Sequence, residues 1–242
     1  MSISPFLGRT LRRRSFLRVA GVTAASSALV LAGCGDDDPE PTTPTTGTPT
    51  LTFSGNNAGL LNYIYLLEQL EAAFYQAVVA AFPSDFSADD RALFVDLRDH
   101  EVIHREALKF VLGTNAYDAS LTTPLEFDFS SFTLTTRAGV LAAARTLEDV
   151  GVAAYAGAGK LFSVATAAET TGVSYLRLAA KLASVEARHA AVVREMASPG
   201  SFAGPDVVAA GLNTALSPVQ VLEAVGKYVK NITLVGTNLP TQ

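Results

Sequence analysis

The stretch that decides the fold is residues 185–189, which reads Val185-Glu186-Ala187-Arg188-His189. It places a carboxylate and an imidazole three residues apart in an Ala- and Leu-rich run, so both project from one face of a predicted helix. That face is otherwise apolar, with Leu182 before the pair and Val193 after it. A buried carboxylate beside a buried imidazole is costly unless a partner compensates their charge.

The same motif occurs once more, as Glu101-Val102-Ile103-His104. It again interrupts an apolar stripe, between Leu97 and Leu108. The chain has three histidines, and two of them lie in these two motifs. The repeated Glu-x-x-His pattern therefore indicates one polar site in the core of a helical domain.

The first 33 residues are predicted to direct the chain out of the cytoplasm. Arg13 and Arg14 begin a run that resembles a twin-arginine export signal, and small apolar residues follow as far as Ala32. Residues 31–34, Leu-Ala-Gly-Cys, resemble a lipobox, where a signal peptide is cut and Cys34 is lipidated. We therefore expect an exported lipoprotein on the envelope or periplasmic side, held to a membrane by Cys34. A plain membrane anchor or a cytosolic N-terminus is the alternative.

Residues 34–55 are expected to form a disordered tether, because they are rich in Pro and Thr and lack apolar periodicity. The chain has 18 Lys and Arg against 23 Asp and Glu. Five of the arginines lie in residues 1–33, so the remainder carries about ten net negative charges. That charge argues against nucleic acid as a partner. The sequence does not fix the oligomeric state.

Four long helices are predicted within residues 56–198, which would form one domain. Their expected bounds are about 57–82, 87–112, 136–162 and 172–196. Ser87 is the expected cap of the second helix. The crossover between the second and third helices contains Phe127 and Phe129, which would pin it onto the bundle or form a short strand. The extension at 199–242 is expected to hold a fifth, shorter helix at 218–229, capped by Ser217.

Four glutamates in these helices fall at matching depths. Glu68 and Glu148 each lie 14 residues before the expected end of their helix, and Glu101 and Glu186 lie 13 and 14 residues after the expected start of theirs. At about 1.5 Å per residue, each carboxylate lies about 20 Å from its connecting turn. The four carboxylates and two imidazoles should therefore form one buried layer, which two divalent cations would neutralise.

This set of residues resembles the ferritin-like di-iron carboxylate superfamily, in which two helices give one Glu each and two others give Glu-x-x-His. The chain is most similar to the exported ferritin-like domain family that includes desiccation-related proteins. That similarity rests on residues 67–75, Leu-Glu-Gln-Leu-Glu-Ala-Ala-Phe-Tyr, and on residues 185–189. It implies an all-α, ferritin-like four-helix bundle with one long crossover.

The resemblance also implies two bound iron ions, with manganese as an alternative. Glu101 and Glu186 would bridge the two metals. Glu68 and His104 would complete one metal, and Glu148 and His189 the other. Tyr75 and Tyr155, each seven residues after its helix's glutamate, would be electron donors or hydrogen-bond partners of the site, or ordinary core tyrosines.

Three other residues near the layer are weaker candidates for a role in the site. Glu71 would replace or assist Glu68, although the spacing to Tyr75 favours Glu68. His100 is expected at the surface, with a contact to the site as the alternative, and Asp149 is expected to face outward. The whole layer is alternatively a polar core without metal.

Two classes of function follow from the resemblance. The first is oxidoreductase chemistry with dioxygen or peroxide, of the ferroxidase or peroxide-reducing type. The second is a non-catalytic metal-binding or structural protein of the envelope, related to stress. These 242 residues hold one Cys and so lack the cysteine-rich electron-transfer module of rubrerythrins, which means that a peroxidase cycle would need an outside reductant.

Overall fold

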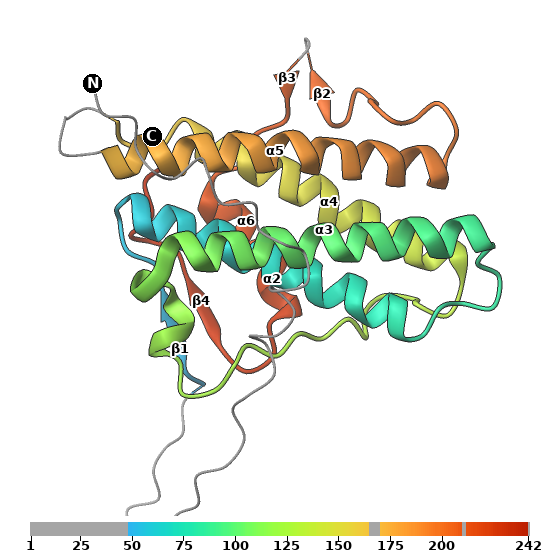
Figure 1. The fold of residues 1–242 in the computed structure, drawn as a ribbon, viewed down its shortest axis with the longest axis horizontal. Helices are drawn as coiled ribbons and strands as arrows, with labels where there is room; N and C mark the ends of the chain where they lie inside the picture. Colours follow the sequence, from blue (N-terminus) through green and yellow to red (C-terminus); the bar gives the residue numbers. More distant parts are fainter. Residues whose placement is uncertain (1–47, 165–169, 210–211, 242) are drawn as a thin grey trace, which may run out of the picture. The chain divides into compact units, whose positions relative to one another are not determined.

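The first pair of helices is set by clear capping signals. In the computed structural model, which describes residues 48–164, 170–209 and 212–241, helix α2 spans Asn57–Ala80 and α3 spans Ala88–Leu112 (Figure 1). The Ser87 hydroxyl accepts a hydrogen bond from the Asp90 amide, and the Asp90 carboxylate accepts one from the Ser87 amide. Gly113 ends α3 at a φ of 55°, a conformation that glycine adopts without strain. Both ends of α3 thus agree with the prediction, whereas α2 ends slightly earlier than expected.

The second pair consists of α4, Arg137–Gly159, and α5, Thr170–Ala197. Figure 1 shows the four long helices side by side, with α2 against α3 and α4 against α5. Two glycines of α4 allow close packing against neighbouring segments. A Cβ on Gly157 would lie 1.8 Å from the Leu216 carbonyl oxygen, and one on Gly151 would lie 2.6 Å from Glu71 Oε1. Gly159 has no such neighbour within 4 Å.

The long crossover between α3 and α4 begins with two short 3-10 turns, Gly113–Asn115 and Tyr117–Ser120. Its phenylalanines then hold it to the bundle: the Phe129 ring lies 5.6 Å from Phe74, and the Phe132 ring lies 5.0 Å from Tyr228. Phe127 also makes an isolated antiparallel bridge with Val229. Both interpretations of this segment therefore hold in part, since the rings pack while the extended backbone makes one bridge.

A small parallel pair of strands joins the two ends of the described chain. Strand β1, Thr50–Thr52, pairs with β4, Thr233–Val235. The last part of the tether expected at 34–55 is therefore ordered, and Leu51 and Phe53 are buried against the core. Two apolar residues in alternation are too short a pattern to predict a strand, and the partner strand lies about 180 residues away.

The C-terminal extension packs on the bundle through a short helix and an irregular segment. Helix α6 spans Pro218–Val225 and continues as a 3-10 turn, Gly226–Tyr228, so the regular helix is shorter than expected. Ser217 caps α6 as predicted, by accepting a hydrogen bond from the Gln220 amide. The apolar face of α6 is buried, which includes Val221 and Val225.

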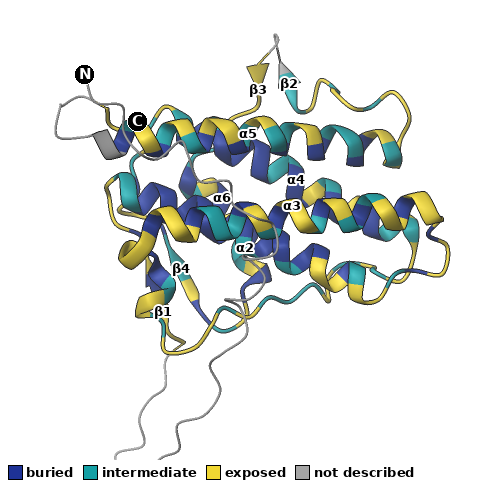
Figure 2. Ribbon diagram, viewed as in Figure 1, coloured by how far each residue is buried: buried dark blue, intermediate teal, exposed yellow. Residues whose placement is uncertain are grey.

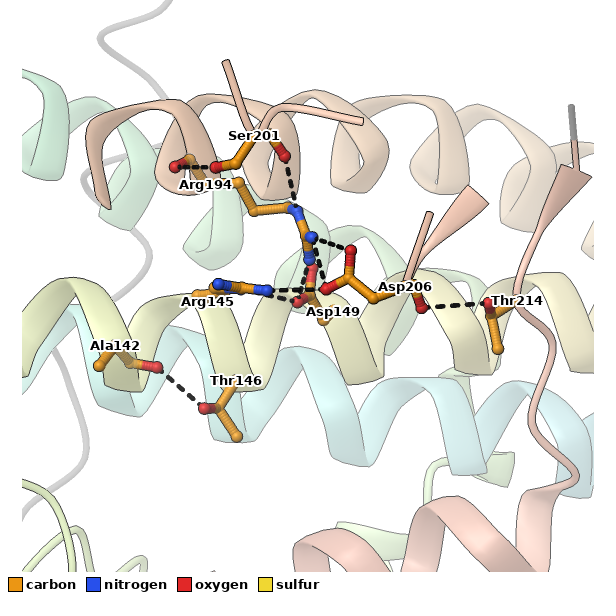
Figure 3. Close-up of polar contacts among 8 residues, drawn as sticks. All are labelled: Ala142, Arg145, Thr146, Asp149, Arg194, Ser201, Asp206 and Thr214. Carbon is orange, nitrogen blue, oxygen red and sulfur yellow. Dashed lines mark hydrogen bonds and ion pairs between the residues drawn. The ribbon is translucent and has the colours of Figure 1, made fainter. Parts of the chain in front are cut away.

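A second strand pair, β2 at Val208–Ala209 and β3 at Leu212–Asn213, lies beyond α5. Figure 3 shows how Arg194 of α5 fixes the segment that leads to it. Arg194 is 1% exposed, and its guanidinium donates hydrogen bonds to Asp149 of α4 at 2.5 Å and to Asp206 at 2.6 and 2.7 Å. Because Arg145 also pairs with Asp206 at 2.7 Å, the extension is held to both helices of the second pair.

The core runs along the facing sides of the four long helices, which Figure 2 shows as buried, with exposed residues on the outer sides. Helix α2 is buried over most of its circumference. Within the described residues, no helix has the length and apolar character needed to cross a membrane. The predicted signal at 1–33 and the predicted lipidation site Cys34 lie outside the described residues.

Candidate metal centre

Six ionisable side chains from four helices meet in the centre of the bundle. Helix α2 gives Glu68, α3 gives Glu101 and His104, α4 gives Glu148, and α5 gives Glu186 and His189. The four carboxylates have no exposed surface, and the two imidazoles are 4–5% exposed. The structure thus brings together all six residues that the sequence predicted as ligands.

Their ligand atoms form two overlapping groups. Each residue of a group offers one ligand atom, and these atoms lie within 4.8 Å of one another. One group contains Glu68, Glu101, His104 and Glu186, and the other contains Glu101, Glu148, Glu186 and His189. Glu101 and Glu186 belong to both. Two groups that share two carboxylates are an arrangement that suits two metal ions side by side.

Each imidazole lies closest to a carboxylate of the other helix pair. His104 Nδ1 is 2.7 Å from Glu186 Oε1, and His189 Nδ1 is 2.7 Å from Glu101 Oε1. The distances to the glutamate of the same motif are longer, 3.5 and 3.6 Å. The layer is therefore built across the two halves of the bundle, which the spacing within one motif does not reveal.

Each of the two tyrosines also contacts a glutamate of the other helix pair. The Tyr75 hydroxyl donates to Glu148 Oε1 at 2.5 Å, and the Tyr155 hydroxyl donates to Glu68 Oε1. Burial, and next the adjacent carboxylate, raise the pKa of each tyrosine well above its usual range. Both phenols therefore stay protonated and orient the carboxylates that they contact.

The electrostatics of the layer favour bound protons when no cation is present. Burial raises the pKa of Glu68 and of Glu148 well above the usual range, and the charge of Glu186 adds to it. Burial opposes charge on the imidazoles, but contacts with Glu101, then Glu186, outweigh it. They raise the pKa of His104 to about 12 and that of His189 to about 10. Burial also opposes charge on Glu101, yet the two imidazoles lower its pKa to about 2.

Many polar atoms of the layer have no hydrogen-bond partner among the described residues. These are both oxygens of Glu101 and Glu186, one oxygen each of Glu68 and Glu148, and Nδ1 of His104 and His189. The short Nδ1–carboxylate contacts lack the geometry of hydrogen bonds. An unpaired buried polar atom costs about 1–3 kcal/mol, and cations at the centre would satisfy all of these atoms together. The donor set of carboxylates and imidazoles fits metal binding.

Glu71 is a fifth buried carboxylate that the two groups do not include. It lies one turn after Glu68, and its Oε1 fills the space that Gly151 leaves by lacking a Cβ. Burial, then the charges of Glu186 and Glu101, raise its pKa well above the usual range. Gly151 follows Glu148 by three residues, as Glu71 follows Glu68, so the sequence did carry a signal for this pairing.

Two further candidates lie around the layer. His100 is exposed, as expected, yet its Nδ1 lies 3.0 Å from His189 Nε2, so the alternative of a contact to the site also holds. Asp149 does not face solvent freely; it is partly buried and pairs with Arg194 and Arg145.

The fold and the site together define a four-helix carboxylate bundle with a buried centre that fits metal ions. The chain belongs to the ferritin-like domain family, whose model matches residues 56–199. The match covers the four long helices and all six residues of the layer. A search of curated proteins finds no significant match. The predicted superfamily is thereby confirmed, while the desiccation-related subgroup and the export signal stay predictions.

Proposed function

We propose that this chain binds two metal ions in the buried layer and uses them in redox chemistry with dioxygen or peroxide. The observation that carries the proposal is the pair of overlapping ligand groups that share two fully buried carboxylates. Glu101 and Glu186 would bridge the metals, Glu68 and His104 would complete one, and Glu148 and His189 the other. Iron is the expected metal, and manganese suits the same donors.

The residues around the layer support this chemistry. Iron bound in such a site would supply electrons to a small oxidant through a change in its oxidation state. The apolar frame keeps bulk water from the carboxylates, which have no exposed surface. Tyr75 and Tyr155 orient Glu148 and Glu68 through the hydrogen bonds that their hydroxyl groups donate.

The first experiment measures metal content per chain in the full protein purified from its native envelope. We expect about two iron or manganese ions per chain, and their loss in a Glu101→Ala/Glu186→Ala double variant. Glu106→Ala is the matched control, because Glu106 lies on α3 at the partly exposed surface and pairs with Arg105. A metal-free protein whose melting temperature does not change on adding iron or manganese would contradict the proposal.

The alternative is a protein that binds metal without catalysis, or an envelope protein in which the layer is structural and related to stress. The single Cys favours this alternative, because a peroxide-reducing cycle then depends on an outside reductant. Peroxide consumption by the metal-loaded protein with a chemical reductant separates the two. Turnover that scales with metal content supports the oxidoreductase, and bound metal without turnover supports the alternative.

We further propose that the protein works outside the cytoplasm, anchored to a membrane by a lipid on Cys34. The order of arginine pair, apolar run and cysteine supports this. The unaltered chain should incorporate a labelled fatty acid, and a Cys34→Ser variant should not. Absence of label from the unaltered chain, or equal labelling of the variant, would contradict lipid anchoring at Cys34.

A further inference from the structure

His100 of α3 meets His189 of α5 edge to edge. His100 Nδ1 lies 3.0 Å from His189 Nε2, the ring planes differ by 15°, and the centroids are 5.2 Å apart. The centroid distance exceeds the nitrogen–nitrogen distance by about the sum of the two ring radii, so the two nitrogens lie nearly on the line that joins the centroids. The longer centroid distance with a short nitrogen–nitrogen distance means that the contact lies in the ring planes, as in a hydrogen bond.

The position of His189 determines which nitrogen donates. Its Nδ1 faces the carboxylate layer, 2.7 Å from Glu101 Oε1, so Nε2 is its outer nitrogen. An imidazole that binds a metal through Nδ1 keeps its proton on Nε2, where it must donate. His100 Nδ1 must then accept, which places the proton of neutral His100 on its own Nε2.

The two histidines also line a surface pocket of about 310 Å³ between α3 and α5. Asp96 and Arg188 lie at the same pocket, and Leu97 and Val185 form part of its apolar wall. His189 is only 4% exposed, whereas His100 is exposed. His100 therefore stands on the solvent side of His189, at a place where the buried layer is close to the surface.

The opposite half lacks this residue. His100 immediately precedes Glu101, and the residue that immediately precedes Glu186 is Val185. The two halves are related by approximate symmetry. Val185 therefore occupies the position from which a residue would contact His104 in the way that His100 contacts His189. An aliphatic side chain accepts no hydrogen bond, so the two imidazoles of the layer are supported differently.

We propose that His100 is a positioning residue, which accepts the Nε2 proton of His189 and holds Nδ1 toward the metal layer. This inference rests on the metal-binding function proposed above. Loss of such an outer partner typically weakens metal binding about 10–100-fold. The loss should fall on one of the two metal positions, the one that His189 completes.

The test is a competition titration of the full chain with Zn²⁺ and a chelator. We expect two zinc ions on the unaltered chain, and one of them bound about 10–100-fold more weakly in His100→Ala. His100→Asn should restore most of the affinity, because its side-chain oxygen can accept at the place of Nδ1. Val185→Ala is the matched control: it trims the same pocket without touching the His100–His189 contact, and should bind both ions normally.

A second measurement reports the hydrogen bond itself. In the zinc-loaded chain, ¹⁵N NMR of the three histidines should show His100 protonated at Nε2 and bare at Nδ1. Failure of the unaltered chain to bind zinc would overturn the metal site and this role with it. Normal binding of both ions by His100→Ala, or a proton on His100 Nδ1, would overturn the role of His100 alone.

Discussion

Helices α2 and α3 contribute a Glu, a Tyr and a Glu-x-x-His motif, and α4 and α5 contribute the same set at the same spacing. The contacts of the two halves are also reciprocal, since each tyrosine and each imidazole reaches the carboxylate of the opposite half. The halves differ at two positions close to these shared residues. Glu71 in the first half corresponds to Gly151 in the second, and His100 corresponds to Val185.

The difference teaches that the shared motifs and their neighbours have separate roles. The shared residues form a layer in which the two metal positions would be equivalent. Glu71 and His100 break that equivalence, because both belong to the first half and each contacts the second. The predictions below test first the shared part and then the asymmetry.

The largest effect is expected from the carboxylates that both ligand groups share. Glu186→Gln keeps the side-chain shape and removes the charge, so both metal positions should lose affinity, about 100-fold or more. Glu148→Gln should weaken only one position by a similar factor, because Glu148 belongs to one group. Zinc stoichiometry at limiting metal checks both variants.

The control for this comparison is Glu71→Gln. Glu71 lies outside both groups, so this variant should keep two zinc ions per chain. Loss of one ion in Glu71→Gln would show that the first half carries an additional ligand. Equal losses in Glu186→Gln and Glu148→Gln would contradict the assignment of a shared and an unshared carboxylate.

The stability of the metal-free protein should fall as the pH rises from 5 to 8. Glu68, Glu71 and Glu148 have raised pKa values, so the folded state keeps protons that the unfolded state releases above pH 4.5. His104 and His189 act in the same direction above pH 6.5. Each such group lowers the free energy of unfolding by up to about 1.4 kcal/mol per pH unit.

The lowered pKa of Glu101 acts only in acid, between about 4.5 and 2, and does not reverse this trend. Metal binding requires Glu68, Glu148 and the two histidines to lose their protons, so the stabilisation by added Zn²⁺ should grow with pH. Thermal melts with and without Zn²⁺ at pH 5, 6.5 and 8 check both signs. A metal-free melting temperature that rises over this range would show that the layer is not protonated as described.

Gly151 of the second half should not tolerate even the methyl side chain of alanine without loss of stability. A Cβ at Gly151 would lie 2.6 Å from Glu71 Oε1, so the buried Glu71 side chain would have to shift within the core. Gly151→Ala should therefore destabilise the protein by about 1–3 kcal/mol. Glu71→Ala in the same chain should remove the clash, so a double-mutant cycle measured by chemical unfolding should show coupling. Additive effects of the two substitutions would contradict the close contact.

Sequence periodicity predicted the four helices and the six layer residues because each depends on local spacing along one helix. It could not predict which carboxylate each imidazole contacts, since His104 and His189 each lie closest to a glutamate of the opposite half. It missed β1, whose partner strand is remote in sequence. The Arg194 cluster was missed for the same reason, because Asp206 comes from an irregular segment.

The smallest effect is expected from the two tyrosine hydroxyls, which test whether the reciprocal contacts are equivalent. Tyr75→Phe leaves Glu148 Oε1 without its donor, and Tyr155→Phe does the same to Glu68. Each should cost about 1 kcal/mol of unfolding free energy, and the two costs should agree. Tyr63→Phe is the matched control, since the buried Tyr63 hydroxyl on α2 has no hydrogen-bond partner among the described residues and its loss should be neutral or stabilising. Unequal costs for Tyr75 and Tyr155 would extend the asymmetry of the halves from the neighbouring residues to the layer itself.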